Sequence, residues 1–118
     1  MSYDHHGNGK IAHLSLGKKL TPLAENLGGT SLGRPYGSGM FSVSNNGTLA
    51  FTHSTPDHPA DLAIVSKGKT KRLTNLNQAL FEQKTLGKVE EVWYNSSVDD
   101  RNIQGWVVYP PNYDASKK

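Results

Sequence analysis

The chain has 118 residues, which is room for one small domain or for parts of two. It contains no cysteine, and this excludes disulfide scaffolds, catalytic thiols and zinc–cysteine sites. The formal net charge is only +3, and no apolar run approaches the roughly 20 residues of a membrane span, so we expect neither a nucleic-acid nor a membrane partner.

The first two thirds of the chain indicate short strands separated by turns. Twelve glycines and six prolines disfavour long helices, and apolar residues alternate with polar ones in short bursts. We expect a loop over 27–39, a hairpin turn at Asn45-Asn46-Gly47 and a rigid connection over 54–60 with Pro56 and Pro59. The expected strands are 11–16, 20–24, 40–44, 48–53, 62–66 and 71–74.

One segment of this region resembles another. Residues 11–23 and 62–76 each read as an apolar strand, a Gly-Lys turn and a strand that carries Leu-Thr. A four-stranded unit that recurs every ~40–50 residues is typical of a β-propeller blade. The alternative is that two lysine-rich hairpins look alike by chance.

The pattern changes after Asn77. A short helix is expected over 78–84, with Asn75 or Asn77 as its N-cap and Gly87 after its end. The expected strands 89–95 and 103–109 form a second hairpin, which Pro110-Pro111 terminates. The fold class is therefore mainly β, with a boundary between residues 77 and 87.

The C-terminal third resembles a known family. Its order is Arg72-Leu73-Thr74-Asn75-Leu76, then Val89-Glu90-Glu91-Val92-Trp93-Tyr94, then Gln104-Gly105-Trp106 through Pro110-Pro111 to Ser116-Lys117-Lys118. This order is similar to the interdomain junction of prolyl oligopeptidase family serine peptidases, closest to the acylaminoacyl-peptidase and dipeptidyl-peptidase branches. The resemblance implies that 1–77 ends a β-propeller, 78–88 is a linker and 89–118 is the first hairpin of an α/β-hydrolase domain.

The resemblance also implies what the parent enzyme does. It would hydrolyse short peptides by a Ser-His-Asp acyl-enzyme mechanism, in the cytoplasm or in a periplasmic or secreted location. The family's oxyanion segment, nucleophile and triad follow the Ser-Lys-Lys stretch, and the chain stops at Lys118. We therefore predict no catalytic, cofactor-binding or metal-binding residue and no activity for this chain alone.

Gly29-Thr30-Ser31-Leu32-Gly33 matches the letters of the hydrolase nucleophile elbow. That motif requires a strand before the serine and a helix after it. Pro35 and further glycines follow instead, and no useful apolar strand precedes. We expect a flexible glycine loop rather than a nucleophile at Ser31.

The histidines do not form a recognisable catalytic or metal motif. His13 and His53 are expected on the exposed face of their strands, and His5-His6 in a disordered terminus that binds metals only adventitiously. His53 and His58 with Asp57 and Asp61 offer the other metal candidate, but their spacing matches no standard zinc pattern.

The remaining motifs favour structural roles. Adjacent residues in a strand point to opposite faces, so Glu90 and Glu91 are not expected to converge on a substrate amine. Trp93 and Trp106 are expected in the core of the second hairpin. Lys67, Lys69, Lys71 and Arg72 are expected on a solvated turn, and the sequons at Asn46 and Asn95 matter only in a eukaryotic secretory route.

Two functional hypotheses follow. The first is a non-catalytic fragment of a serine peptidase, whose open strands would allow homo-oligomers or strand swapping. The second is a stand-alone all-β binding module with the Gly28–Gly39 loop as its ligand surface. Short peptides are the expected substrates of the parent only.

Overall fold

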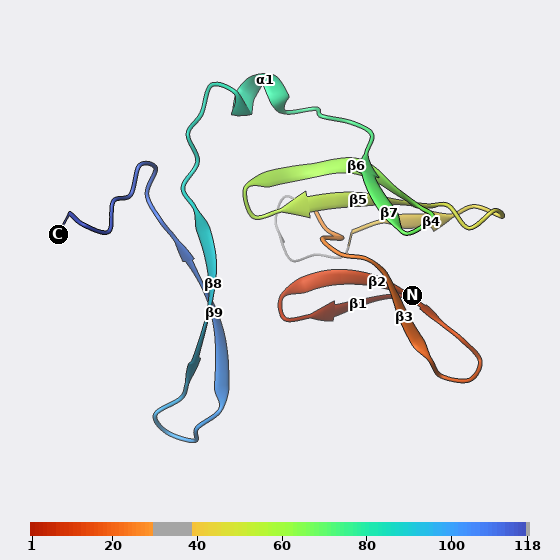
Figure 1. The fold of residues 1–118 in the computed structure, drawn as a ribbon, viewed down its shortest axis with the longest axis horizontal. Helices are drawn as coiled ribbons and strands as arrows, with labels where there is room; N and C mark the ends of the chain where they lie inside the picture. Colours follow the sequence, from red (N-terminus) through yellow and green to blue (C-terminus); the bar gives the residue numbers. More distant parts are fainter. Residues whose placement is uncertain (30–38, 118) are drawn as a thin grey trace. The chain divides into compact units, whose positions relative to one another are not determined.

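The computed structural model describes residues 1–29 and 39–117 and divides into two compact units, Met1–Leu76 and Asn77–Lys118. Its architecture is mainly β, with three antiparallel sheets and one short helix in the described residues (Figure 1). This confirms the expected fold class at the level of β structure. No closed ring of blades is present among those residues, so the propeller remains a proposal.

The first unit begins with a three-stranded sheet of order β1-β2-β3. Its strands are β1 (Ser2–His5), β2 (Asn8–Leu14) and β3 (Leu20–Ala24). The expectation of a disordered terminus at His5-His6 is wrong. His6 and Gly7 both have positive φ angles, 51° and 64°, the geometry of a tight two-residue hairpin turn, and this turn pairs β1 with β2.

The second sheet of this unit has four strands in the order β4-β5-β6-β7. They are β4 (Phe41–Val43), β5 (Leu49–Thr55), β6 (His58–Ser66) and β7 (Lys69–Arg72). The predicted hairpin turn between β4 and β5 is confirmed, because Ser44 N donates to Thr48 O at 2.9 Å across Asn45-Asn46-Gly47.

The expected connection over 54–60 is largely strand instead. β5 runs on to Thr55, β6 begins at His58, and the register shifts between His53 and Thr55. β7 pairs with β6 only from Ala63 onward, so among the described strands none pairs with the side of β6 away from β5 at Pro59. A proline, which lacks an N–H donor, is tolerated there for that reason.

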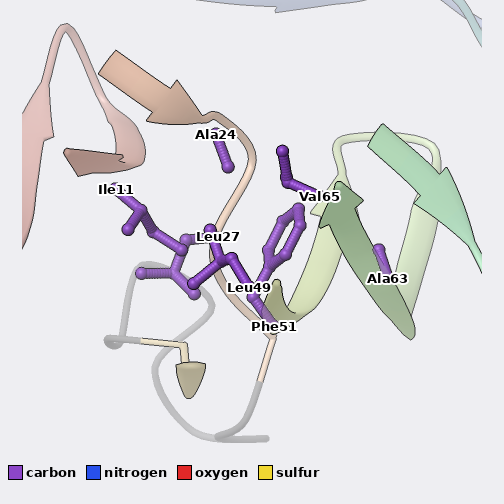
Figure 2. Packing of buried hydrophobic residues seen from close by; sticks show 7 residues of the cluster. All are labelled: Ile11, Ala24, Leu27, Leu49, Phe51, Ala63 and Val65. Carbon is purple, nitrogen blue, oxygen red and sulfur yellow. The ribbon is translucent and has the colours of Figure 1, made fainter. Parts of the chain in front are cut away.

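The core of this unit is formed by seven buried apolar side chains (Figure 2). Alternation along β5 and β6 places Leu49, Phe51, Ala63 and Val65 on one face, and the register pairs Leu49 with Val65 and Phe51 with Ala63. The first sheet and the segment after it supply Ile11, Ala24 and Leu27. Burial of this face against the other sheet holds the unit together.

The two similar segments do not bury equivalent positions. Ile11 is 1% exposed, whereas Leu62, its counterpart in the repeat, is 43% exposed. A register shift between Ile11 and Ala12 buries both of these neighbours, while β6 alternates regularly from Asp61 to Ser66. A β-bulge of this kind changes which face a residue occupies, and the sequence repeat did not indicate it.

The second unit contains α1 (Gln78–Phe81), β8 (Val89–Asn95) and β9 (Asn102–Val108). The helix is shorter than expected, and its N-cap residue Asn77 makes no side-chain cap hydrogen bond. No helix in the described part of the chain has the length and apolar character needed to cross a membrane.

The expectation that Trp93 and Trp106 form a buried core is wrong. Their exposed fractions are 42% and 48%, and none of the residues of β8 and β9 is buried. A two-stranded sheet has no second layer of its own against which large side chains can pack.

Candidate functional site

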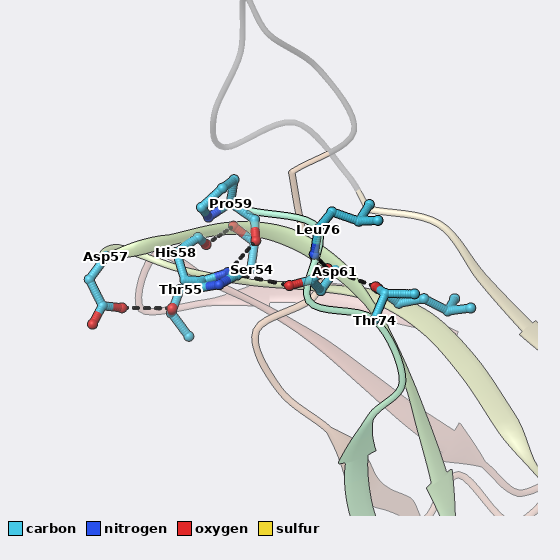
Figure 3. Close-up of polar contacts among 9 residues, drawn as sticks. Ser54, Thr55, Asp57, His58, Pro59, Asp61, Thr74 and Leu76 are labelled. Atoms are coloured by element: carbon cyan, nitrogen blue, oxygen red, sulfur yellow. Dashed lines mark hydrogen bonds and ion pairs between the residues drawn. The ribbon is translucent and has the colours of Figure 1, made fainter. Parts of the chain in front are cut away.

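The most enclosed polar side chain described in the chain is that of Asp61 on β6. Its exposed fraction is 2%, and it lies on the same strand face as Ala63 and Val65. A buried carboxylate requires compensating hydrogen bonds. Its Oδ1 receives two: Thr74 Oγ1 donates at 2.7 Å and Leu76 N at 3.1 Å (Figure 3).

Thr74 links this carboxylate to the backbone of β6. Its hydroxyl donates to Asp61 and accepts from Leu62 N at 2.9 Å. The carbonyl of Leu62 in turn accepts from Leu73 N at 2.7 Å and from Thr74 N at 3.4 Å. The segment that follows β7 is therefore held against β6 as far as Leu76. We call Asp61, Thr74 and the Leu62 and Leu76 backbone groups the Asp61 clasp.

His58 lies at the other oxygen of the carboxylate. Its Nδ1 is 3.6 Å from Asp61 Oδ2 and 2.8 Å from Pro59 O. Because a carbonyl only accepts, Nδ1 must carry the proton in this geometry. Asp61 Oδ2 is buried and receives no hydrogen bond, so the imidazole is its nearest electrostatic partner.

The surroundings of Asp61 favour its charged form. The Thr74 hydroxyl, followed by the Leu76 N–H, holds the pKa of this carboxyl below its ordinary value, and the charges of His58 and Arg72 act in the same direction. Burial opposes them but does not prevail. Asp61 is therefore a carboxylate at neutral pH.

His53 differs from the expected exposed strand residue. Burial lowers the pKa of its imidazole, the charge of Arg72 lowers it further, and its Nδ1 is buried without a hydrogen-bond partner. Its ring packs edge-on against Phe51 at a centroid distance of 5.9 Å. The bridge between Leu27 and His53 brings the segment after β3 onto β5, and His53 is half-buried.

A shallow hollow of about 370 Å³ borders His53. Glu25 is the acidic residue of its lining, and Lys10 neutralises the Glu25 charge in an ion pair at 2.9 Å. The amide of Asn26 is likewise engaged with Asn8 at 2.8 Å. The lining residues are Pro22, Leu23, Ala24, Glu25, Asn26, His53 and Thr70.

Of the candidate metal residues, His58 approaches Asp61 at 3.6 Å, but Asp57 does not join them. Asp57 accepts from Thr55 Oγ1 at 2.7 Å in the turn between β5 and β6, whereas Asp61 accepts from Thr74. Within residues 1–29 and 39–117, no group of three or more His, Asp or Glu side chains could hold a metal ion. The Thr74 hydroxyl is committed as both donor and acceptor, so the chemistry of the clasp is hydrogen bonding.

The other candidate residues from the sequence are scattered. Ser31 and its motif lie outside the described residues. Glu90 pairs with Lys88 at 2.9 Å, while Glu91 accepts from Trp93 Nε1 and Gln104 Nε2. His13 is exposed, the His5 and His6 rings stack at 3.9 Å, and the basic residues Lys67, Lys69, Lys71 and Arg72 are all exposed.

One feature of the sequence could have indicated the clasp: Asp61 lies on the strand face of the apolar residues Ala63 and Val65. Residues 61, 63 and 65 share one strand face, and an acidic residue at a position where apolar partners are buried requires a specific donor. The nearest candidate was the threonine of the Leu-Thr pair after β7. Spacing alone marks Asp61 only as a candidate metal ligand, and it marks Thr74 only as part of a repeat.

The comparisons with known proteins relate the chain to a peptidase. It is 36% identical over 80 residues to Dipeptidyl-peptidase 5 of Porphyromonas gingivalis, a match that covers 66% of this chain. The chain spans about a tenth of the length of that relative, 11%. No family model and no solved structure matches it.

Proposed function

We propose that this chain is the interdomain junction of a serine peptidase of the prolyl oligopeptidase family. In this proposal residues 1–77 end a β-propeller, 78–88 are the linker and 89–118 begin an α/β-hydrolase domain. The observation that carries it is the 36% identity over 80 residues to a dipeptidyl peptidase. The parent enzyme would cleave short peptides through a Ser-His-Asp triad and an acyl-enzyme.

The order of the structural elements supports this assignment. A four-stranded antiparallel sheet, the form of a propeller blade, is followed by a connecting segment and then by a separate hairpin. The apolar face of the four-stranded sheet packs on the sheet that precedes it, as neighbouring blades do. Among the described strands, β4 and β7 each have a hydrogen-bonded neighbour on one side only.

The chain itself contributes scaffold to the proposed enzyme. The Asp61 clasp fixes the chain after β7 at Leu76, directly before the boundary between the two units. The Thr74 hydroxyl of the clasp is not a free nucleophile, because it already donates a hydrogen bond to Asp61. We propose that the catalytic residues belong to another part of the parent enzyme.

The test is to read the source gene past the codon for Lys118 and to express its full product. We expect an oxyanion segment, a G-x-S-x-G serine and a later Asp and His. The product should release dipeptides from short peptides and react with a fluorophosphonate probe. Replacement of the elbow serine by alanine should abolish both signals, and the 118-residue chain is the unreactive control.

A gene product without these residues would refute the peptidase proposal. The chain would then be treated as a binding module, and ligand screens would begin with the Gly28–Gly39 loop.

A further inference from the structure

The sequence contains two Asn-Gly pairs, Asn8-Gly9 and Asn46-Gly47. An asparagine followed by glycine is open to cyclisation, because glycine has no Cβ to hinder attack of its nitrogen on the asparagine side chain. Whether the reaction takes place in a folded protein depends on how the side-chain amide and the glycine backbone are held. The structure holds the two pairs in opposite ways.

The side-chain amide of Asn8 is locked to another segment of the first unit. Its Nδ2 donates to Asn26 Oδ1 at 2.8 Å, and its Oδ1 accepts from Asn26 N at 2.8 Å. The Gly9 carbonyl accepts from Leu27 N at 2.9 Å, so the backbone after Asn8 is held as well. Cyclisation would break both bonds to Asn26 in a partly buried site, where loss of a hydrogen-bond partner is costly.

The side-chain carbonyl of Asn46 is directed toward its own backbone instead. Its Oδ1 accepts from Thr48 N at 3.1 Å, which is the hydrogen bond of an Asx turn. The ring that this bond closes contains both Asn46 Cγ and Gly47 N, the two atoms that cyclisation joins. Residues 44–47 of this turn are exposed, so water and hydroxide can reach it.

Two donors converge on Asn46 Oδ1. Besides Thr48 N, Ser44 Oγ donates at 2.6 Å, and its alternative acceptor Thr48 O is farther away at 3.0 Å. Attack on Cγ places negative charge on Oδ1, and donors already aimed at this oxygen stabilise that charge. One bond opposes the reaction, because Gly47 N donates to Ser44 O at 2.9 Å. It is a single neutral bond in an exposed turn, where local opening requires little free energy.

We propose that Asn46-Gly47 is a site of spontaneous modification, at which Ser44 and Thr48 activate the asparagine side chain. Gly47 N loses its proton to hydroxide and bonds to Asn46 Cγ. The Cγ–Nδ2 bond then breaks, and Nδ2 takes a proton from water and leaves as ammonia. One water opens either carbonyl–nitrogen bond of the resulting succinimide and yields aspartate or isoaspartate. This inference goes beyond the proposed function, because it requires only residues of this chain and water.

The modification would act on the turn that joins β4 to β5. Both products add a negative charge, and isoaspartate carries the main chain through the side-chain carbonyl carbon, which adds one backbone atom between Val43 and Leu49. These two residues are paired across the hairpin, and Leu49 belongs to the buried core. Because turn geometry sets the register of a hairpin, isoaspartate would disturb the pairing of β4 with β5.

The first measurement is peptide mapping by mass spectrometry of the 118-residue chain during storage at mildly alkaline pH. Electron-transfer fragmentation distinguishes isoaspartate from aspartate. In the folded chain, conversion should be at least about 10-fold faster at Asn46 than at Asn8, because Asn8 must give up two hydrogen bonds. In the chain unfolded by urea, the two rates should become similar, because both asparagines precede a glycine.

The second measurement tests the activation through Ser44. Ser44→Ala removes the hydroxyl donor and should slow conversion at Asn46 by roughly 3- to 10-fold, as expected for one hydrogen bond. Ser44→Thr keeps a hydroxyl and should convert like the unmodified chain. Ser42→Ala makes the same change on exposed β4 and should leave the rate unaltered. Far-UV circular dichroism verifies that each variant is folded, and in urea Ser44→Ala should have no effect.

Three results would overturn the proposal. Equal rates at Asn8 and Asn46 in the folded chain would show that the structure does not select between the two pairs. An intact Asn46 in the folded chain, over a period in which the unfolded chain converts, would show that the turn protects this residue. An unchanged or faster rate in folded Ser44→Ala would show that the hydroxyl does not activate the side chain.

Discussion

Replacement of Phe51 by alanine should remove much of the stability of the first unit. Phe51 is 1% exposed and packs among buried residues of both sheets (Figure 2). A buried aromatic side chain removes roughly 150–250 Å² from water, which at about 25 cal/mol per Å² corresponds to about 4–6 kcal/mol. Alanine retains part of that contact, and measured Phe-to-Ala costs in cores are about 3–5 kcal/mol.

Phe41 provides a graded control for this substitution. It lies directly across the ladder from Phe51 on the same sheet face, but it is 37% exposed. Scaled by its burial, Phe41→Ala should cost about 2–3 kcal/mol. A unit of this size has a net stability of roughly 4–11 kcal/mol, so Phe51→Ala should remove a large part of it.

The assay is urea unfolding followed by far-UV circular dichroism. Phe51→Ala should unfold at a much lower urea concentration than Phe41→Ala, and Phe51→Leu should lie between Phe51→Ala and the unmodified chain. Equal costs for Phe51→Ala and Phe41→Ala, or a cost below about 1 kcal/mol for Phe51→Ala, would refute the placement of Phe51 at the centre of the core.

Three further predictions follow from particular contacts. Gly9→Ala should destabilise the first unit, because a Cβ there would collide with the Leu27 carbonyl. Gly17→Ala, whose Cβ would have its nearest neighbour at 3.8 Å, should be neutral or slightly stabilising in thermal unfolding; equal costs would contradict the close approach at Gly9. As the pH falls below 6.5, the free energy of unfolding of the first unit should decrease. His53, whose pKa is lowered by burial, binds its proton more readily in the unfolded state. The free energy of unfolding of the first unit should decrease again below pH 3.8 as Asp61, whose pKa the Thr74 hydroxyl holds down, loses the stability present above that pH; Asp61→Asn should weaken this second decrease. Because both tryptophans lie in the second unit, tryptophan fluorescence should report its unfolding alone, and Phe51→Ala should move the circular dichroism transition but not the fluorescence one; a shift of both would show that the units unfold together.

The sequence alone identified most of the strands and the turn that joins β4 to β5. Alternation along 48–53 and 62–66 predicted β5 and β6, and Asn45-Asn46-Gly47 predicted the hairpin between β4 and β5. These features are local, because strand alternation and turn conformation depend on neighbouring residues. The mainly β fold class followed from the same patterns.

The burial of particular residues was decided only by the tertiary structure. His53 was expected to be exposed, but it is half-buried at the strand position that Leu27 bridges. Trp93 and Trp106 were expected in a core, but their hairpin has no second layer in its unit. Whether such a residue is buried depends on whether another layer packs against its face of the sheet. Alternation shows which residues share a face, but it does not show which face is covered.

The clasp shows the same division most clearly. Asp61 and Thr74 are thirteen positions apart in the sequence, and no local pattern indicates that they contact each other. Pairing of β6 with β7 brings them together, and burial then makes each hydrogen bond to the carboxylate necessary. The sequence determined where the strands form. The packing of the strands determined that the Asp61 carboxylate is buried and that Thr74 and Leu76 donate its hydrogen bonds.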